Sequence, residues 1–314
     1  MIKSKNLYMA NFNCTFGDEH YPMLDYFEEI VLPAFINKYK KETSKNTFFF
    51  HNVKLVEYSK GQFALTGIIV KQTILEVKSL IDEETQSIIK KDDKIPSDPF
   101  SYFILFLDTH RMVLVKNQSG SPTLKNFESL SKYTLREASI EFAQDGDIIP
   151  ISLNIGSLPS SSKVDEALAK ILEIQEITLK IYPLNGDIDN VYGSVRTELE
   201  RMGAAEGFTT FKRPQNRQEV SRALKESKGI FRTKIRGKGL KGEKITIDND
   251  EVASVTPIEI NEDVSIEENI NNMLEEIQSK EELRELSEEN RNKYEEKKTV
   301  LRRILALFNS NTTM

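Results

Sequence analysis

The sequence has no tryptophan, a single cysteine and three histidines among its 314 residues. One cysteine, Cys14, cannot form an intrachain disulfide, a composition typical of proteins kept in a reducing compartment. The cysteine and the histidines do not stand at the spacing of zinc ligands, so no metal site is expected. There is no apolar run of the roughly 20 residues that a transmembrane helix needs, and no signal peptide behind Met1. These absences predict a cytoplasmic protein with no membrane partner and no cofactor.

The charge is distributed in blocks. The net charge is −6, yet residues 212–244 carry twelve Lys or Arg and only three Glu. The next segment, 245–296, carries seventeen Asp or Glu and four Lys or Arg. Blocks of this kind report on partners and contacts rather than on fold.

Strand-like alternation and helix-like spacing occur in both halves of the chain. The clearest signal is a hairpin at 100–116, in which two apolar runs enclose the turn Asp108-Thr109-His110-Arg111. By contrast, 81–99 is polar, acidic and bounded by proline, which favours a loop or a short helix. The stretch 156–162 is rich in glycine and serine and is the best candidate for a linker.

Each half begins with a strand, a helix and a strand, followed by a hairpin. This order predicts an α+β protein with two lobes built on split β-α-β (ferredoxin-like) units, mainly antiparallel sheets and a C-terminal helical tail. The predicted segments are a strand-rich α+β domain at 1–158, an α+β domain with a basic hairpin at 163–260, and a helical tail or helical hairpin at 264–314.

The basic hairpin at 229–248 is the most informative feature. Alternation along its first strand places Arg232, Lys234 and Arg236 on one face, and the connecting glycines let backbone N–H groups approach an anion. Cations interleaved with aromatics suit a surface that grips a phosphate backbone and stacks bases, with Phe208, Phe211 or Phe231 as the stacking rings. The predicted DNA- or RNA-binding residues are Arg213, Arg217, Arg222, Lys228, Phe231, Arg232, Lys234, Arg236, Lys238 and Lys241.

Two readings compete with nucleic-acid binding. The basic block could be a solvated face, or it could dock onto the acidic segment within or between chains, as in a non-catalytic assembly or sensor subunit. A homo-oligomer could form through the tail, whose apolar stripes are Leu283/Leu286 and Leu301/Ile304/Leu305/Phe308.

A catalytic alternative rests on Glu76 and Lys78. A Mg²⁺-dependent nuclease needs carboxylates for the metal and a lysine on the same strand, and Glu76-Val77-Lys78 fits, with Glu57 and Asp82 as companion carboxylates. The same spacing recurs four more times in the chain, so the pattern is weakly specific. His110 is a candidate general base, although a polar hairpin tip explains its turn equally well.

The strand, turn and strand of Phe103–Val115, the segment Ile181–Asn185 and the glycine-rich basic hairpin together resemble a family of uncharacterised bacterial proteins found near phage-defence and mobile-element loci. The resemblance implies a role in antiviral defence, as one component of a multi-protein system with other defence proteins as partners. It assigns no catalytic residues.

Overall fold

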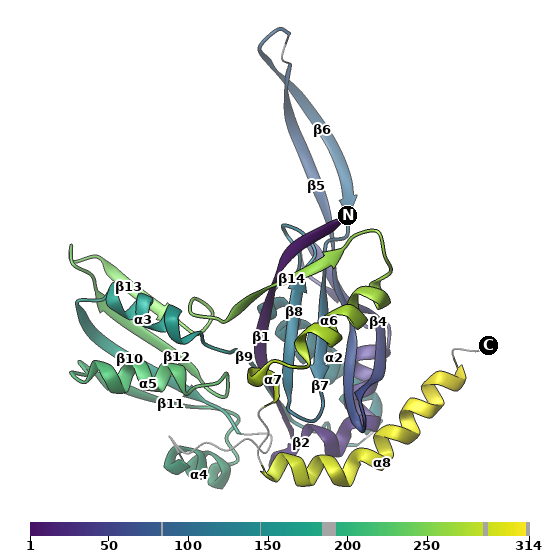
Figure 1. Cartoon of the computed structure of the whole chain (residues 1–314), viewed down its shortest axis with the longest axis vertical. Coiled ribbons are helices and arrows are strands. Elements are labelled where there is room, and N and C mark those ends of the chain that lie inside the picture. The colour runs from purple at the N-terminus through teal and green to yellow at the C-terminus, as the bar shows by residue number, and fades with distance from the viewer. Residues whose placement is uncertain (83, 145, 184–192, 285–287, 312–314) are drawn as a thin grey trace.

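Two antiparallel sheets organise the chain (Figure 1). The computed structural model describes residues 1–82, 84–144, 146–183, 193–284 and 288–311. The first sheet has ten strands, in the order β14-β1-β8-β7-β5-β4-β3 with β2, β6 and β9 off this path, and the second has four, in the order β11-β10-β12-β13. The predicted α+β class with mainly antiparallel sheets is confirmed.

The strands of the first sheet are β1 (Ile2–Phe16), β2 (Tyr21–Pro22), β3 (Lys41–Glu42), β4 (Asn46–Ser59), β5 (Gln62–Asp82), β6 (Ser87–Ser97), β7 (Phe100–Phe106), β8 (Arg111–Lys116), β9 (Ile151–Ser157) and β14 (Val255–Asn261). Those of the second are β10 (Glu173–Ile181), β11 (Gly207–Lys212), β12 (Arg232–Lys238) and β13 (Lys244–Asp248). The helices are η1 (Met23–Tyr26), η2 (Phe27–Val31), α1 (Leu32–Ile36), α2 (Leu124–Ala143), α3 (Ser161–Ala169), α4 (Gly193–Met202), α5 (Arg217–Lys225), α6 (Ile266–Ile277), α7 (Glu281–Arg284) and α8 (Glu288–Asn311).

Each sheet contains a split β-α-β unit. Strands β8 and β9 pair antiparallel with opposite edges of β1, so they run parallel to each other, and α2 connects them. In the second sheet β11 and β12 flank β10 in the same way and α5 connects them. The strand inserted between the two parallel strands is the defining feature of the predicted unit.

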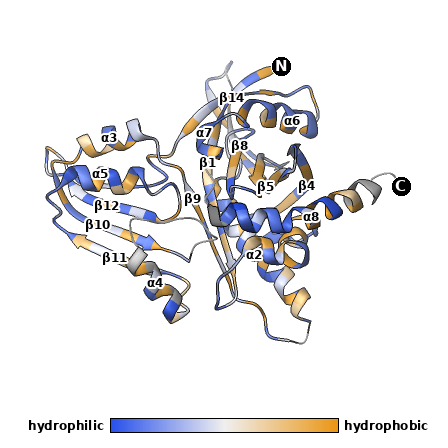
Figure 2. Cartoon of the chain, turned by 60° about the horizontal axis from the view of Figure 1, so that its bottom comes forward, coloured by the Kyte–Doolittle hydropathy of each residue, from blue (hydrophilic) through white to orange (hydrophobic). Residues whose placement is uncertain are grey.

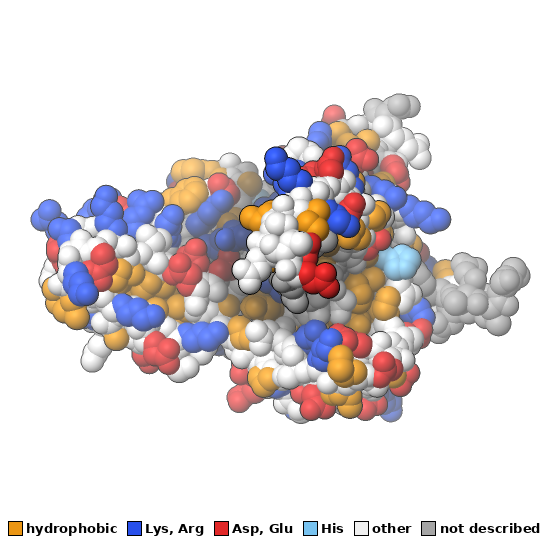
Figure 3. All heavy atoms as spheres, turned by 90° about the horizontal axis from the view of Figure 1, so that it is seen from above, with side chains coloured by type: hydrophobic (Ala, Val, Ile, Leu, Met, Phe, Trp, Pro, Cys, Tyr) orange, Lys and Arg blue, Asp and Glu red, His pale blue; other side chains and the backbone are white. Residues whose placement is uncertain are grey.

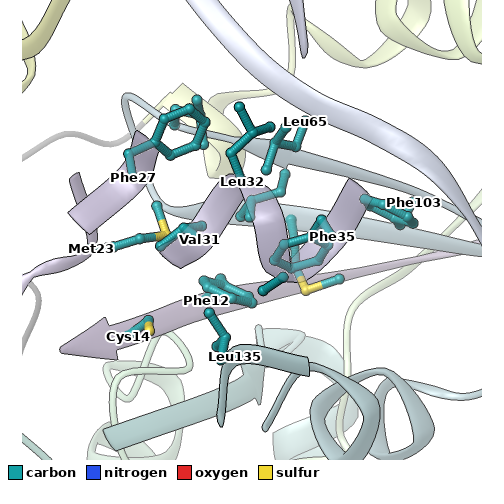
Figure 4. Packing of buried hydrophobic residues seen from close by; sticks show 14 of the residues in the cluster. Phe12, Cys14, Met23, Phe27, Val31, Leu32, Phe35, Leu65, Phe103 and Leu135 are labelled. Atoms are coloured by element: carbon teal, nitrogen blue, oxygen red, sulfur yellow. The ribbon is translucent and has the colours of Figure 1, made fainter. Parts of the chain in front are cut away.

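The first sheet is buried on both faces, which explains its continuous apolar runs. Along β1, Phe12 and Cys14 point to the core covered by η2, α1 and α2, while Leu7 and Met9 point to the core covered by α6. Figure 4 shows the first of these cores, where Phe35 of α1 lies among side chains of the sheet. Burial raises the pKa of the Cys14 thiol, so this cysteine is an inert core residue.

The segment 81–99 is not a loop or a helix, as its composition suggested. Strand β5 continues to Asp82 and β6 pairs with it from Thr73↔Ser97 to Asp82↔Ser87. The two strands form a ribbon that projects from the body (Figure 1). Charged residues are frequent in this segment, but it also holds β-branched isoleucines (Ile81, Ile88 and Ile95), which favour extended strands.

The chain returns to the first sheet after the second. Strand β14 pairs with β1 from Ile2↔Asn261 to Tyr8↔Val255, so the segment predicted as 163–260 supplies β10–β13 to the second sheet and β14 to the first. We call the first sheet with its helices the first lobe, and the second sheet with α3, α4 and α5 the second lobe. The tail then packs on the first lobe. Its helices carry hydrophilic and hydrophobic residues side by side (Figure 2). Leu283, Leu301 and Ile304 are buried in the cores of their own chain, so they do not form the exposed stripes expected for a homo-oligomer. Leu286 lies outside the described residues.

Candidate functional site

The second sheet has one covered and one open face. Helices α3 and α5 pack on the covered face, where Ile177, Leu179 and Ile235 contact Val220 and Leu224. Because side chains alternate along a strand, the residues between these apolar positions point to the other side. We call the outward side chains of β10–β13 the open face.

Cross-strand register arranges the open face in rows. The first row is Phe208, Lys180 and Arg232, the second is Thr210, Thr178, Lys234 and Asp248, the third is Lys212, Glu176, Arg236 and Thr246, and the fourth is Glu173, Lys238 and Lys244. The rows hold seven cations against three carboxylates, so the face is strongly positive. Figure 3 shows Lys and Arg side chains gathered along one side of this lobe, at the left of the view.

Glu176 is neutralised from both sides. It forms ion pairs with Lys212 and with Arg236, the latter at 3.3 Å. The Lys212 ammonium lowers the pKa of the Glu176 carboxyl, so this carboxylate does not oppose an anionic ligand. Lys234 and Lys238 are exposed and form no ion pair with any described residue. These two ammonium groups are therefore available to phosphates.

Alternation along β12 places Arg232, Lys234 and Arg236 on one face, as predicted. Lys238 continues the series, and Lys241 follows in the loop to β13. The sequence pattern did not single out Lys180, because one outward lysine on β10 gives no signal until pairing places it between Phe208 and Arg232.

Two predicted cations, both on α5, lie away from the open face. The Arg217 guanidinium donates to the carbonyl oxygen of Leu168 in the last turn of α3 and to those of Ile171 and Leu172 just beyond the helix. This is a C-terminal capping role, which satisfies carbonyls left open by the helix. Arg222 pairs with Glu219 one turn earlier on α5.

The other two predicted residues before the hairpin have positive φ. Arg213 has φ 48° and Lys228 has φ 42°. The Lys228 carbonyl accepts a hydrogen bond from Arg111 of the first lobe at 2.8 Å. Both residues therefore shape the backbone beside the sheet rather than extend the open face.

Phe231 is a core residue, which corrects its assignment as a stacking ring. It is 2% exposed and packs under the second sheet. Phe208 is 62% exposed, in contact with the Lys180 ammonium at 5.3 Å from its ring centroid. Strand alternation puts Phe211 on the opposite side from Phe208. Phe208 is thus the aromatic of the open face.

Arg232 joins the two lobes. It pairs with the buried Glu128 of α2 and donates to Asn154 at 2.9 Å and to the Ile155 carbonyl at 3.2 Å. Beside it, a pocket of about 230 Å³ opens between the open face and β9, lined also by Lys125, Lys180 and Lys234. The open face therefore ends at a basic recess against the first lobe.

The acidic tail does not cover the open face in the described part of the chain. Its ion pairs go to the first lobe, from Glu267 to Lys54, and from Lys293 and Lys297 to Asp25. Helix α6 lies against β14 and β5. The docking of the basic block onto the acidic tail is therefore not observed among these residues.

Glu76 and Lys78 lie on the projecting ribbon, with both side chains largely exposed and 3.4 Å apart. The cross-strand partner of Glu76 is Lys94, not a second carboxylate. Across the described residues, no three His, Cys, Asp or Glu side chains come together as metal ligands. Neither Glu57 nor Asp82 completes the set required by the nuclease hypothesis.

The turn of His110 is buried, so it is not a polar hairpin tip. Asp108, Thr109, His110 and Arg111 are each at most 3% exposed. The His110 carbonyl accepts from the Phe12 amide at 2.7 Å, and His110 itself has φ 53°. Asp108 accepts hydrogen bonds from Tyr58 at 3.0 Å and from Gln62 at 2.8 Å. These contacts indicate a structural turn.

Burial raises the pKa of Asp108 above its ordinary value. A carboxyl group with a raised pKa in the folded state holds its proton to higher pH than it does in the unfolded chain. Between the unfolded-state and folded-state pKa values, the free energy of unfolding therefore falls as the pH rises. We expect the free energy of unfolding of the native protein, relative to Asp108→Asn, to fall as the pH rises above about 4, the ordinary pKa of an aspartate. Urea denaturation of both proteins across that range measures the difference, and a constant difference would contradict the prediction.

A family model described as "Domain of unknown function (DUF4747)" matches residues 5–275. A search of curated proteins gave no match. Within the part of the chain that the structure describes, every helix is too short or too polar to cross a membrane.

Proposed function

We propose that this chain, which belongs to the family described as Domain of unknown function (DUF4747), binds single-stranded nucleic acid on the open face of its second sheet. The observation that carries the proposal is the composition of that face, with seven cations, a neutralised Glu176 and the exposed Phe208. Cations placed beside an exposed ring are the combination that tracks a backbone and stacks a base.

The shape of the face favours a single strand over a duplex. An antiparallel sheet with helices on one face offers its other face as a platform for unstacked bases. On this platform Phe208 stands at one end, the hydroxyls of Thr178 and Thr210 at the centre, and Lys238 at the far end. A single strand would stack one base on Phe208 and run its phosphates along β12.

The first test removes Lys234 and Lys238, two lysines of the open face that form no ion pair with a described residue. Lys234→Ala with Lys238→Ala should weaken binding of a labelled single-stranded 12-mer and make the salt dependence of log K shallower by about 1.4, because each single-strand phosphate contact contributes about 0.7 to the slope. The matched control, Lys170→Ala with Arg222→Ala, removes the same charge from the C-cap of α3 and from α5, on the covered side of the sheet. Equal effects of the two pairs of substitutions would contradict the proposal.

The second test removes the ring. Phe208→Ala should weaken binding by about 5- to 100-fold, in line with the loss of one stacked base. The salt slope should stay unchanged, because no phosphate contact is lost. A parallel series with Phe211→Ala serves as the control, since that ring lies on the other side of β11.

We further propose that this binding takes place in the cytoplasm and serves bacterial antiviral defence, with DNA or RNA as the ligand and other defence proteins as partners. The absence of a second cysteine supports the reducing compartment. The resemblance carried by Phe103–Val115 and Ile181–Asn185 supports the defence role.

A further inference from the structure

The projecting ribbon, which we call the arm, comprises residues Thr73–Ser97. Pairing of β4 with β5 ends at Asn46↔Thr73, so beyond this point no described strand lies on that edge of the arm. The arm therefore stands away from the body as two strands alone (Figure 1). An isolated two-stranded hairpin is only marginally stable in water.

The arm carries an unusual amount of exposed apolar surface. Six of its side chains are among the large hydrophobic residues that stay exposed, with exposed fractions between 45% and 75%: Ile74, Leu75, Ile81, Ile88, Ile89 and Ile95. Contiguous apolar surface on a projecting element marks a contact with another macromolecule.

Register divides these residues between two faces. One face carries Leu75 beside Ile95 near the base and Ile81 beside Ile88 near the tip. Between them the pairs are Val77 with Asp93 and Ser79 with Lys90. An irregularity between Val77 and Ser79 adds one residue to β6, which keeps the pairs Leu75–Ile95 and Ile81–Ile88 on the same side. We call this side the apolar face of the arm.

We propose that the apolar face packs against the same face of a second copy of this chain, with the two arms antiparallel. A two-fold axis through the middle of the arm places Leu75 and Ile95 of one copy against the partner's Ile81 and the partner's Ile88. The same axis places Asp93 of each copy against the partner's Lys90, so the interface contains two such pairs. With the two arms running in opposite directions, apolar residues thus face apolar residues and lysine faces aspartate. An isologous interface requires this match, because both copies use the same patch.

The two charged residues of the apolar face, Lys90 and Asp93, also suit this role. In the structure Lys90 forms no ion pair with any described residue, and Asp93 has only the exposed Lys91 at 3.3 Å. In the dimer, Lys90 would therefore form an ion pair that it does not form with described residues of its own chain, and Asp93 would form a second one.

The test uses charge reversal in the full chain, with the oligomeric state measured by sedimentation equilibrium. The wild type should be a dimer. Lys90→Asp and Asp93→Lys should each weaken the dimer at least about tenfold, because each sets like charges against each other twice. The double variant K90D/D93K should regain dimerisation, since it restores opposite charges with their signs exchanged.

A mixture of the two single variants gives the sharpest result. Lys90→Asp leaves two acids on the face and Asp93→Lys leaves two lysines, so the two proteins should form a heterodimer more tightly than either forms a homodimer. A matched control exchanges the charges of the opposite face, E76K/K94E, and should dimerise as the wild type does. Thermal unfolding of each variant checks that the body of the protein is folded.

Three results would overturn the proposal. The wild type could be monomeric, which would leave the arm to a different protein. The dimer could persist unchanged in both single variants, which would place the interface elsewhere. The mixture could dimerise no more tightly than either variant alone, which would refute the antiparallel register. The proposal does not depend on nucleic-acid binding, because the arm is on the first sheet and the open face is on the second.

Discussion

Replacing Gly229 with alanine is expected to lower the free energy of unfolding by about 3 kcal/mol, through backbone strain and overpacking together. Gly229 has φ 75°, a conformation that L residues rarely adopt. A Cβ atom built there would lie 2.3 Å from the Gly156 carbonyl oxygen and 3.0 Å from the Asn11 side chain. Because the first obstacle is backbone, it cannot move aside as a flexible side chain would.

Two further variants separate the cost of the backbone contact at Gly229 from the cost of its positive φ. Gly242 has φ 79° and nothing within 4 Å of a built Cβ atom, so Gly242→Ala reports the cost of the conformation alone, about 1 kcal/mol. Gly156→Ala reports the contact, because its Cβ atom would lie 2.2 Å from the Gly229 carbonyl oxygen. Urea denaturation of the three variants measures each contribution. A loss at Gly229 no larger than at Gly242 would show that the two lobes are not in close contact there.

This contact explains why 156–162 is not a flexible linker. Gly156 and Ser157 are part of β9, paired with β1, and α3 begins at Ser161. The same glycine and serine content that suits a linker also permits two backbones to approach closely. Composition alone does not distinguish the two cases, because the deciding partner, Gly229, is 73 residues away along the chain.

The sequence pattern correctly predicted those strands and helices whose hydrophobic periodicity is visible within a few neighbouring residues. The hairpin at 100–116 is an example, since β7 and β8 follow each other and bury both faces. Alternation also predicted the shared face of Arg232, Lys234 and Arg236. The arm was missed because its apolar residues are separated by charges, and no core shields them.

The sequence pattern did not predict which side chains of the candidate site are buried. Phe231 and Phe208 are both aromatic residues next to cations, yet one lies in the core and the other on the open face. The difference is set by strand phase and by which face α3 and α5 cover. Lys228 and Arg232 likewise fall at the junction of the lobes, which depends on the packing of β9 against the second sheet.

Arg232→Ala is expected to destabilise the protein by about 2–3 kcal/mol, whereas Lys234→Ala two residues later should change stability by less than about 0.5 kcal/mol. Arg232 pairs with Glu128, which is buried between the lobes, and donates two further hydrogen bonds to β9. Removing it leaves Glu128 with Lys132 at 2.8 Å as its remaining cation, which limits the loss. Lys234 is exposed and forms no ion pair with a described residue.

Arg232→Lys should recover little of this stability, because an ammonium group cannot form the guanidinium's separate bonds to Glu128, Asn154 and Ile155. A double-mutant cycle of Arg232→Ala with Glu128→Gln, measured by urea denaturation, isolates the pair. A coupling energy near zero would contradict an anchoring role. If the coupling is large, weaker nucleic-acid binding in Arg232 variants will partly reflect displacement of the second lobe. Lys234 is then the better residue for measuring contact with phosphate, because its removal takes away charge while leaving the geometry of the open face intact.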